Sequence, residues 1–355
     1  MTRYFNEASR KIGPLPSPGD RMGHRSEQAT KARLACLSFA LFLAILVVRG
    51  AVQAAACPAL PSPYAGPIFD ANVQAWNPDL QGLITSLPTS GVKRIALFAN
   101  IRAGGTLTGD AVLAASRQYP NLIIVGAPKI GFITGGDLPS EFVSSTLSGV
   151  ASGTYKFVGE ILYTHGDKPD HRPTKSGEVY VDPLAAGTAR LLEGLRGRNV
   201  PLLTHWEAWA WDRDRPRFDR LYATWPRQPF VLPSLAYGSP EKADTILSVH
   251  PNVWGIISRL VDGRYHFVDP AKAAKLGPPM FDECGSLRPD WRAVLIKYSD
   301  RLMYGSDDYS NPRNLQGWDL YPRIIARYRN IAGQLPPDVA RKISWDNAAS
   351  LYGQR

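Results

Sequence analysis

Eight short apolar segments recur along the chain, with amphipathic segments between them. Continuous apolar strands that alternate with helices indicate a parallel sheet covered on both faces. Eight such units predict a closed (β/α)₈ barrel of the TIM type, with an open doubly wound sheet as the alternative. The first apolar segment lacks the Gly-x-Gly-x-x-Gly turn of dinucleotide-binding sheets, so that function has no support. The apolar segments cover residues 67–71, 93–99, 122–126, 155–160, 201–205, 229–233, 253–258 and 302–305.

Helices are predicted between and after these strands. Two of them begin with a clear start signal, Asn77-Pro78-Asp79 and Ser239-Pro240-Glu241. Each signal places a capping residue before a proline and then a carboxylate in the first turn. The predicted helices cover residues 78–88, 107–118, 138–149, 183–197, 215–224, 239–249, 287–299, 316–331 and 336–352.

The N-terminal region has the pattern of an export signal. Lys31 and Arg33 precede an unbroken apolar run at residues 34–48, and three alanines, 54–56, end the region. This pattern is typical of a secretory signal, and the run is shorter than the roughly 20 apolar residues of a spanning helix. We therefore expect a periplasmic or secreted protein without a membrane span in the mature chain. An uncleaved anchor is the alternative.

The predicted boundaries follow from this pattern. Residues 1–56 form the signal region, for which Met22 is an alternative start, residues 57–66 form a proline-rich linker, and residues 67–355 form one barrel domain. Cys57 follows the three alanines directly, but the residue three positions before it is alanine, so lipid attachment is the weaker interpretation. Cys57 and Cys284 could pair in an oxidising compartment, and the sequence leaves this open.

The charge distribution gives no sign of a nucleic-acid partner. The formal net charge is +10, yet the chain after residue 56 holds 33 Lys and Arg and 28 Asp and Glu, a net charge of +5. No basic cluster interleaved with aromatic residues marks a nucleic-acid track. We expect a small-molecule substrate and no nucleic acid.

Polar side chains suited to catalysis end three of the apolar segments. Glu160, His205 and Asp307 stand at or directly after the carboxyl ends of the fourth, fifth and eighth predicted strands. The carboxyl ends of barrel strands carry the chemistry of TIM barrels, and a carboxylate there can hold a metal or take a proton from water. These three side chains are predicted to form one hydrolytic site.

With these strand ends placed, the chain resembles the amidohydrolase superfamily, in particular its amidohydrolase-related, decarboxylase-like branch. The resemblance spans residues 67–352 and implies a distorted (β/α)₈ barrel with one or two divalent ions. The motifs that carry it are Pro67–Ala75, Val158–Ile161, Leu202–Trp206, Asp300–Asp307 and Ile343–Tyr352.

The resemblance also implies a depleted metal site. The family's first strand normally ends in Asp-x-His-x-His, and Asn72 and Gln74 stand where the two histidines would be. No histidine occupies the sixth-strand position, whereas His205 matches the fifth-strand histidine and Asp307 the eighth-strand aspartate. Glu160 matches a fourth-strand glutamate that some members place near the metal.

Two mechanisms remain open for such a site. Glu160, His205 and Asp307, with His165 from the following loop, could hold one zinc or manganese ion. Without a metal, Asp307 would act as the base and His205 would polarise a carbonyl group.

Four further residues are predicted to contact the substrate. Asn72 and Gln74 either bind it or fill the space of the lost imidazoles, and Arg259 could clamp a carboxylate through two hydrogen bonds. Trp206 could wall an apolar pocket, or it could pack against a helix.

The predicted function is hydrolysis of a small carboxylate, lactone or amide by water attack, with one divalent metal or none. The alternative is a non-catalytic extracytoplasmic ligand-binding protein derived from a hydrolase barrel, because several metal ligands are lost. A barrel fold alone does not decide between them.

Overall fold

The computed structural model describes residues 57–76, 79–130, 136–166, 179–258, 275–309 and 321–353, without the side chains of residues 101–107 and 308–309. The chain divides into two units, residues 1–57 and 58–355, and the second contains the barrel. The predicted signal region, the Asn77-Pro78 helix start and Arg259 lie outside the described residues.

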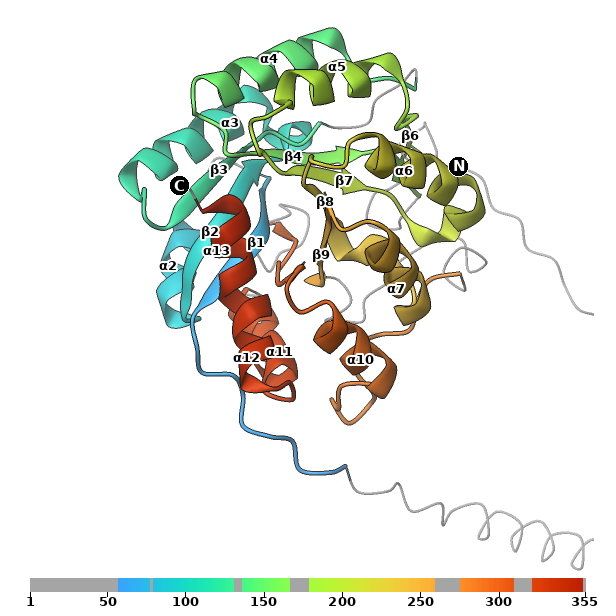
Figure 1. Cartoon of the computed structure of the whole chain (residues 1–355). Helices are drawn as coiled ribbons and strands as arrows, with labels where there is room; N and C mark the ends of the chain where they lie inside the picture. The colour runs from blue at the N-terminus through green and yellow to red at the C-terminus, as the bar shows by residue number, and fades with distance from the viewer. Residues whose placement is uncertain are drawn as a thin grey trace, which may run out of the picture. The chain divides into compact units, whose positions relative to one another are not determined.

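Within the described residues, eight parallel strands form a nearly closed barrel, which confirms the predicted fold class (Figure 1). Each predicted apolar segment overlaps one observed strand. The last strand is in two parts, of which the first pairs with β9 and the second with β1. The strands are β1 (Ile68–Ala75), β2 (Val92–Ala99), β3 (Ile123–Ala127), β4 (Phe157–Leu162), β7 (Leu202–His205), β8 (Phe230–Leu232), β9 (Val253–Ile256), β10 (Leu302–Met303) and β11 (Asp308–Tyr309).

Helices surround the strands, as the sequence pattern predicts. The predicted start of α7 is confirmed, because the Ser239 hydroxyl accepts a hydrogen bond from the Lys242 backbone N–H at 3.4 Å and Pro240 is the first helical residue. The helices are α2 (Gln81–Thr89), α3 (Ile101–Gln118), α4 (Ser140–Ala151), α5 (Ala186–Leu195), α6 (Trp211–Thr224), α7 (Pro240–Val249), α10 (Pro289–Lys297), α11 (Tyr321–Ala332), α12 (Pro337–Arg341) and α13 (Asn347–Tyr352).

The barrel interior is apolar near its amino end. One cluster of buried apolar side chains contains residues of every barrel strand from β1 to β10, together with Ala348 and Tyr352 of α13. The Tyr352 ring lies 5.1 Å from the ring of Phe157, a residue of β4. The interior is thus a packed core, as in other barrels of this type. This packing leaves the carboxyl ends of the strands as the place for polar groups.

A short hairpin of β5 (Thr164–His165) and β6 (Val179–Tyr180) follows β4. The backbone N–H of Tyr163 donates to the carbonyl oxygen of His205 at 2.9 Å, so the start of the hairpin is tied to the end of β7. This contact brings His165 to the site, although the sequence pattern places it in a loop.

The segment 304–307 between β10 and β11, here called the seam, closes the barrel. Ala71 donates its N–H to Tyr304 at 2.9 Å, and Asp307 donates its N–H to Asn72 at 2.8 Å. Gly305 is required because an added Cβ would lie 2.7 Å from Ile256 Cγ2 and 2.8 Å from Asn72 Cβ. The backbone of Asp307 then turns into the left-handed region, with φ 50°. The eighth predicted strand is therefore interrupted where it presents its carboxylate.

Asp70 fixes the seam to β1. Its carboxyl group accepts hydrogen bonds from the backbone N–H of Asn72 at 3.2 Å, from that of Ser306 at 2.8 Å and from the Tyr321 hydroxyl at 2.9 Å. Burial raises the pKa of Asp70 to about 6, and these hydrogen bonds offset only part of that effect.

We expect Asp70 to make folding pH-dependent. Its pKa rises from 3.8 to about 6 on folding, so the folded chain binds this proton more tightly than the unfolded chain. The resulting contribution to the free energy of unfolding is about 3 kcal/mol. It is fully present below pH 4 and is lost as the pH rises towards and through 6. Asp70→Asn keeps the acceptor for both N–H groups and should remove this part of the pH dependence. Urea unfolding from pH 4 to 8 measures it, and an unchanged slope in the variant would refute the assignment.

Candidate active site

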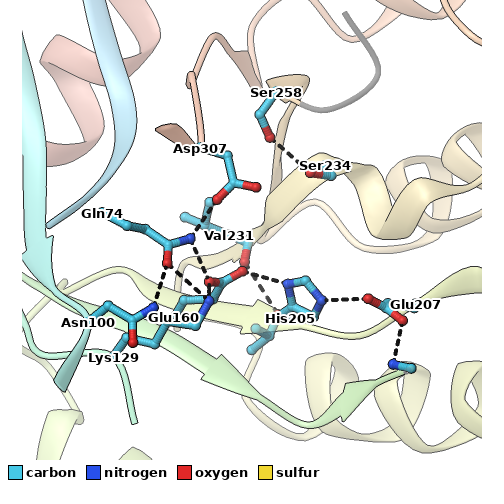
Figure 2. Close-up of polar contacts among 12 residues, drawn as sticks. Gln74, Asn100, Lys129, Glu160, His205, Glu207, Val231, Ser234, Ser258 and Asp307 are labelled. Carbon is cyan, nitrogen blue, oxygen red and sulfur yellow. Dashed lines mark hydrogen bonds and ion pairs between the residues drawn. The ribbon is translucent and has the colours of Figure 1, made fainter. Parts of the chain in front are cut away.

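Every strand of the described barrel brings one polar side chain to its carboxyl end (Figure 2). All of these side chains are buried. Backbone pairing continues beyond the strand ends, because Lys129 donates its N–H to Ala99 at 2.8 Å and forms a parallel bridge with Asn100. In strand order the side chains are Gln74, Asn100, Lys129, Glu160, His205, Ser234, Ser258 and Asp307.

One amide group joins a buried cation to two carboxylates. The Lys129 ammonium group forms an ion pair with Glu160 Oε2 and donates to Gln74 Oε1 at 3.2 Å. Asn100 Nδ2 donates to the same Gln74 oxygen at 3.1 Å. Gln74 Nε2 in turn donates to Glu160 Oε2 at 3.1 Å and to Asp307 Oδ1 at 2.5 Å. The Gln74 amide therefore sets the position of Asp307 relative to Lys129 and Glu160.

His205 lies between two glutamates. Glu160 Oε1 is 2.5 Å from His205 Nδ1, and Glu207 Oε1 is 3.2 Å from Nε2 on the other side of the ring. The second oxygen of Glu207 accepts hydrogen bonds from the Trp209 indole N–H and the Gly166 backbone N–H, each at 2.8 Å. Both glutamates are thus held in place by further donors.

The charges of this network stabilise one another. Burial alone would raise the pKa of Glu160, but Lys129 and His205 outweigh it and hold that pKa well below its usual range. Burial alone would lower the pKa of His205, but the carboxylates of Glu160 and Glu207 outweigh it and raise that pKa. Glu160 is therefore a carboxylate, and His205 favours a cationic form.

A strained turn follows the sixth barrel strand, β8, and contacts the end of the seventh, β9. Residues 234–237 all have positive φ angles although none is glycine. Positive φ angles at residues other than glycine are strained, and such residues are most common at functional sites. The turn places the Ser234 hydroxyl 2.9 Å from that of Ser258 and the Tyr237 ring 6.1 Å from the His205 ring.

The structure brings together most of the residues predicted from the sequence. Gln74, Glu160, His205 and Asp307 belong to one network (Figure 2). The His165 ring stacks on that of His205 with 5.4 Å between centroids. The buried charge of Glu160 is balanced within the network by its ion pair with Lys129.

Two predicted substrate-binding residues lie elsewhere. Trp206 packs between the barrel and α6, with its ring stacked at 4.9 Å on Phe218 and its N–H donating to the Tyr222 hydroxyl at 3.2 Å. Successive residues of a strand point to opposite faces, so the inward His205 sends Trp206 outward. Asn72 is fully buried against the seam, and its amide has no hydrogen-bond partner among the described residues.

Sequence reasoning missed Lys129, Asn100 and Glu207. Asn100 follows β2 directly, so the strand-end rule applied to that strand would have found it. Glu207 stands two residues after His205 and therefore on the same side of the chain. Lys129 is two residues beyond the end of β3, and only its long side chain returns to the network.

The position between β1, β4 and the seam does not fit the metal ion that the resemblance implies. The ammonium group of Lys129 already contacts the Glu160 carboxylate and the Gln74 carbonyl oxygen. Gln74 turns its N–H group, rather than an oxygen, towards Asp307. A divalent cation placed there would meet a like charge and amide hydrogens.

Another group of metal-ligand type lies on the opposite side of His205. One ligand atom each of His165, His205 and Glu207 lie within 4.8 Å of one another, and all three residues are buried. Two imidazoles and one carboxylate are a donor set that zinc and manganese accept.

The comparisons with known proteins agree with this fold. An uncharacterized TIM-barrel protein from Bordetella bronchiseptica is 11% identical and has a TM-score of 0.53, with 81% of this chain and 100% of that chain covered. The model of the amidohydrolase family matches residues 151–354, more than half of the sequence, so the chain belongs to the amidohydrolase family. The match begins after β3, so Gln74, Asn100 and Lys129 precede it.

Two further solved structures have weaker similarity to the chain. An amidohydrolase from Burkholderia multivorans with bound zinc is 14% identical, with a TM-score of 0.45 and coverage of 82% of this chain and 100% of that chain. A 2,6-dihydroxybenzoate decarboxylase complexed with 2,6-dihydroxybenzoate is 11% identical, with a TM-score of 0.45 and coverage of 76% and 86%. No curated protein matches the chain.

Proposed function

We propose that the protein hydrolyses a carboxylic ester, lactone or amide bond of a small substrate at the carboxyl end of its barrel. The observation that carries this proposal is the network in which Gln74 joins the Asp307 carboxylate to Lys129 and Glu160. A base next to fixed positive charge is what water attack on a carbonyl carbon requires.

Asp307 is the general base of the proposed reaction. Its buried carboxylate is oriented by the 2.5 Å hydrogen bond from Gln74. The water oxygen bonds to the carbonyl carbon while Asp307 takes the proton. The C–O or C–N bond then breaks, and the proton passes to the leaving group. Lys129 and His205 supply the positive charge that stabilises the anion on the carbonyl oxygen, which forms after water attack and before the bond breaks.

Glu160 positions both cationic groups and does not itself react. One of its oxygens pairs with Lys129 and the other with His205. Because a carboxylate with two cationic partners is a poor proton acceptor, this assignment separates the roles of the two acids, Glu160 and Asp307.

Hydrolysis in ¹⁸O-labelled water tests the reaction class. Wild-type protein incubated with panels of esters, lactones and amides should release a carboxylate product that contains one ¹⁸O atom. Carbon dioxide release from aromatic carboxylates, without label uptake, would instead favour decarboxylation. An absence of turnover on every panel would contradict the hydrolase proposal. The alternative of a non-catalytic ligand-binding protein finds no support in the comparisons.

We also propose a periplasmic or secreted location. The support is that Cys57 and Cys284 are both disulfide-bonded, which is typical of oxidising compartments. A cysteine in a disulfide cannot carry a lipid thioether, so this argues against lipid attachment at Cys57. Among the described residues, no helix has the length and apolar character needed to span a bilayer.

Cell fractionation checks the location. We expect a chain that lacks residues 1–56 in the periplasm or medium, with both cysteines protected from thiol labelling until a reductant is added. A full-length cytoplasmic chain with reactive thiols at both positions would refute the proposal.

A further inference from the structure

We propose that the chain binds one divalent metal ion through His165, His205 and Glu207, on the side of His205 that faces away from Lys129. This site shares His165 and His205 with the ligand set predicted from the sequence, but Glu207 takes the place of Glu160 and Asp307. It does not depend on the proposed hydrolysis, because the argument concerns ligand geometry alone.

Backbone contacts set the distance between the two imidazoles. The carboxyl end of β4 pairs with β7 with Leu162 opposite His205, and the N–H of Tyr163 donates to the carbonyl oxygen of His205 at 2.9 Å. His165 follows on β5, which the pairing with β6 holds in place. One nitrogen of each ring lies within 4.8 Å of the other and of a Glu207 oxygen, so both rings can approach the same ion.

Hydrogen bonds orient His205 as a metal ligand. Its Nδ1 faces Glu160 Oε1 at 2.5 Å, which directs Nε2 towards Glu207. A carboxylate behind a ligating histidine is the usual outer partner of such ligands, where it fixes the ring and raises its basicity. Glu160, held in turn by Lys129, fits this supporting role better than that of a direct ligand.

Glu207 presents its carboxylate in the same way. Its Oε2 accepts two N–H groups, those of Gly166 and Trp209, while Oε1 faces His205 Nε2 at 3.2 Å. Ligand atoms that lie 2.0–2.1 Å from a tetrahedral zinc ion are about 3.3 Å apart. The observed separation therefore accommodates an ion between the two atoms with little movement.

The charges favour the same assignment. Lys129 balances Glu160, so a dication on the far side of His205 would replace the Nε2 proton of that ring and would meet the Glu207 carboxylate and two imidazoles. Three protein ligands leave one tetrahedral position for water, as in catalytic zinc sites. Such an ion activates bound water or polarises a carbonyl oxygen.

Measuring the metal content of variants distinguishes this site from the position at the seam that includes Asp307. Mature protein stripped with a chelator is reloaded with zinc or manganese alone and analysed by elemental analysis and titration calorimetry. We expect one ion per chain in wild type, and at least 100-fold weaker binding in His165→Ala and Glu207→Gln. Glu160→Gln should weaken binding by about 10-fold to 100-fold.

Matched controls decide between the two positions. Asp307→Asn should retain the ion, as should His250→Gln, whose histidine pairs with Asp219 at 2.8 Å away from the site. Circular dichroism checks that each variant folds. Should Glu207→Gln fail to fold, His165→Ala and the milder His165→Gln carry the test.

Three outcomes would overturn the proposal. They are loss of the ion in Asp307→Asn with retention in His165→Ala, full retention in both His165 variants, and no binding of zinc or manganese by folded wild type. Cobalt(II) loading gives an independent readout, since a tetrahedral site shows intense visible absorption that His165→Ala should abolish.

Discussion

Asp307→Asn is expected to lower kcat/KM for hydrolysis by about 100-fold to 10,000-fold, the range typical of a lost general base. Asparagine retains the shape of the side chain and the oxygen that accepts the Gln74 hydrogen bond. It cannot take a proton from water. The loss should therefore appear in kcat, with substrate binding nearly unchanged, and steady-state kinetics on the best substrate of the ester, lactone and amide panels measures it.

The control for this variant is Asp300→Asn, which makes the same chemical change just before β10. The Asp300 side chain is 78% exposed and pairs with Lys342 at 2.7 Å on the surface. Exposed ion pairs contribute little to stability, so this variant should match wild type in activity and in urea unfolding. Wild-type turnover in folded Asp307→Asn would remove Asp307 from the mechanism.

Much of the barrel is visible in the sequence because strands and helices differ in local pattern. Residues 93–99, for example, form a continuous apolar run, and the observed strand β2 covers Val92–Ala99. The rule that barrel chemistry lies at the carboxyl ends of strands then places Glu160 and His205 at one edge. Neither step requires knowledge of side-chain contacts.

The partners within the site follow from three-dimensional geometry that local pattern does not contain. The cation opposite Glu160 is Lys129, which reaches the network only because pairing beyond β3 sets its direction. His165 lies in a stretch that reads as a polar loop, and its position depends on the hairpin of β5 and β6. The left-handed turn at Asp307, which interrupts the last strand, is a tertiary effect of closing the barrel.

The Gln74 amide on the first strand and Lys129 after the third strand are complementary in charge and hydrogen bonding. Gln74 Oε1 accepts hydrogen bonds from both Asn100 and Lys129, so one carbonyl oxygen binds the Lys129 ammonium group and an amide N–H at once. A neutral imidazole at this position would offer one acceptor nitrogen rather than an oxygen with two lone pairs. Glutamine at position 74 therefore suits a neighbouring ammonium group better than a histidine would.

Lys129→Met should reduce hydrolysis by about 100-fold to 1,000-fold, comparable to the loss of one oxyanion-stabilising group. Methionine has a similar length but no charge. The Lys129 side chain is only 10% exposed and pairs with a Glu160 side chain that is 2% exposed. Removing one partner of a buried pair leaves the other charge uncompensated and costs about 3–5 kcal/mol. The variant should therefore lose stability as well as activity, as urea unfolding and kcat/KM measure.

A double variant separates these two effects. Lys129→Met combined with Glu160→Gln removes both charges and leaves an amide that can still bond to His205 and Gln74. It should recover most of the lost stability, because no unpaired carboxylate remains at the Lys129 position. Activity should stay low, since the positive charge next to the reacting carbonyl is still missing. Recovery of activity together with stability would mean that Lys129 only supports the fold, and wild-type activity in the single variant would exclude it from the reaction altogether.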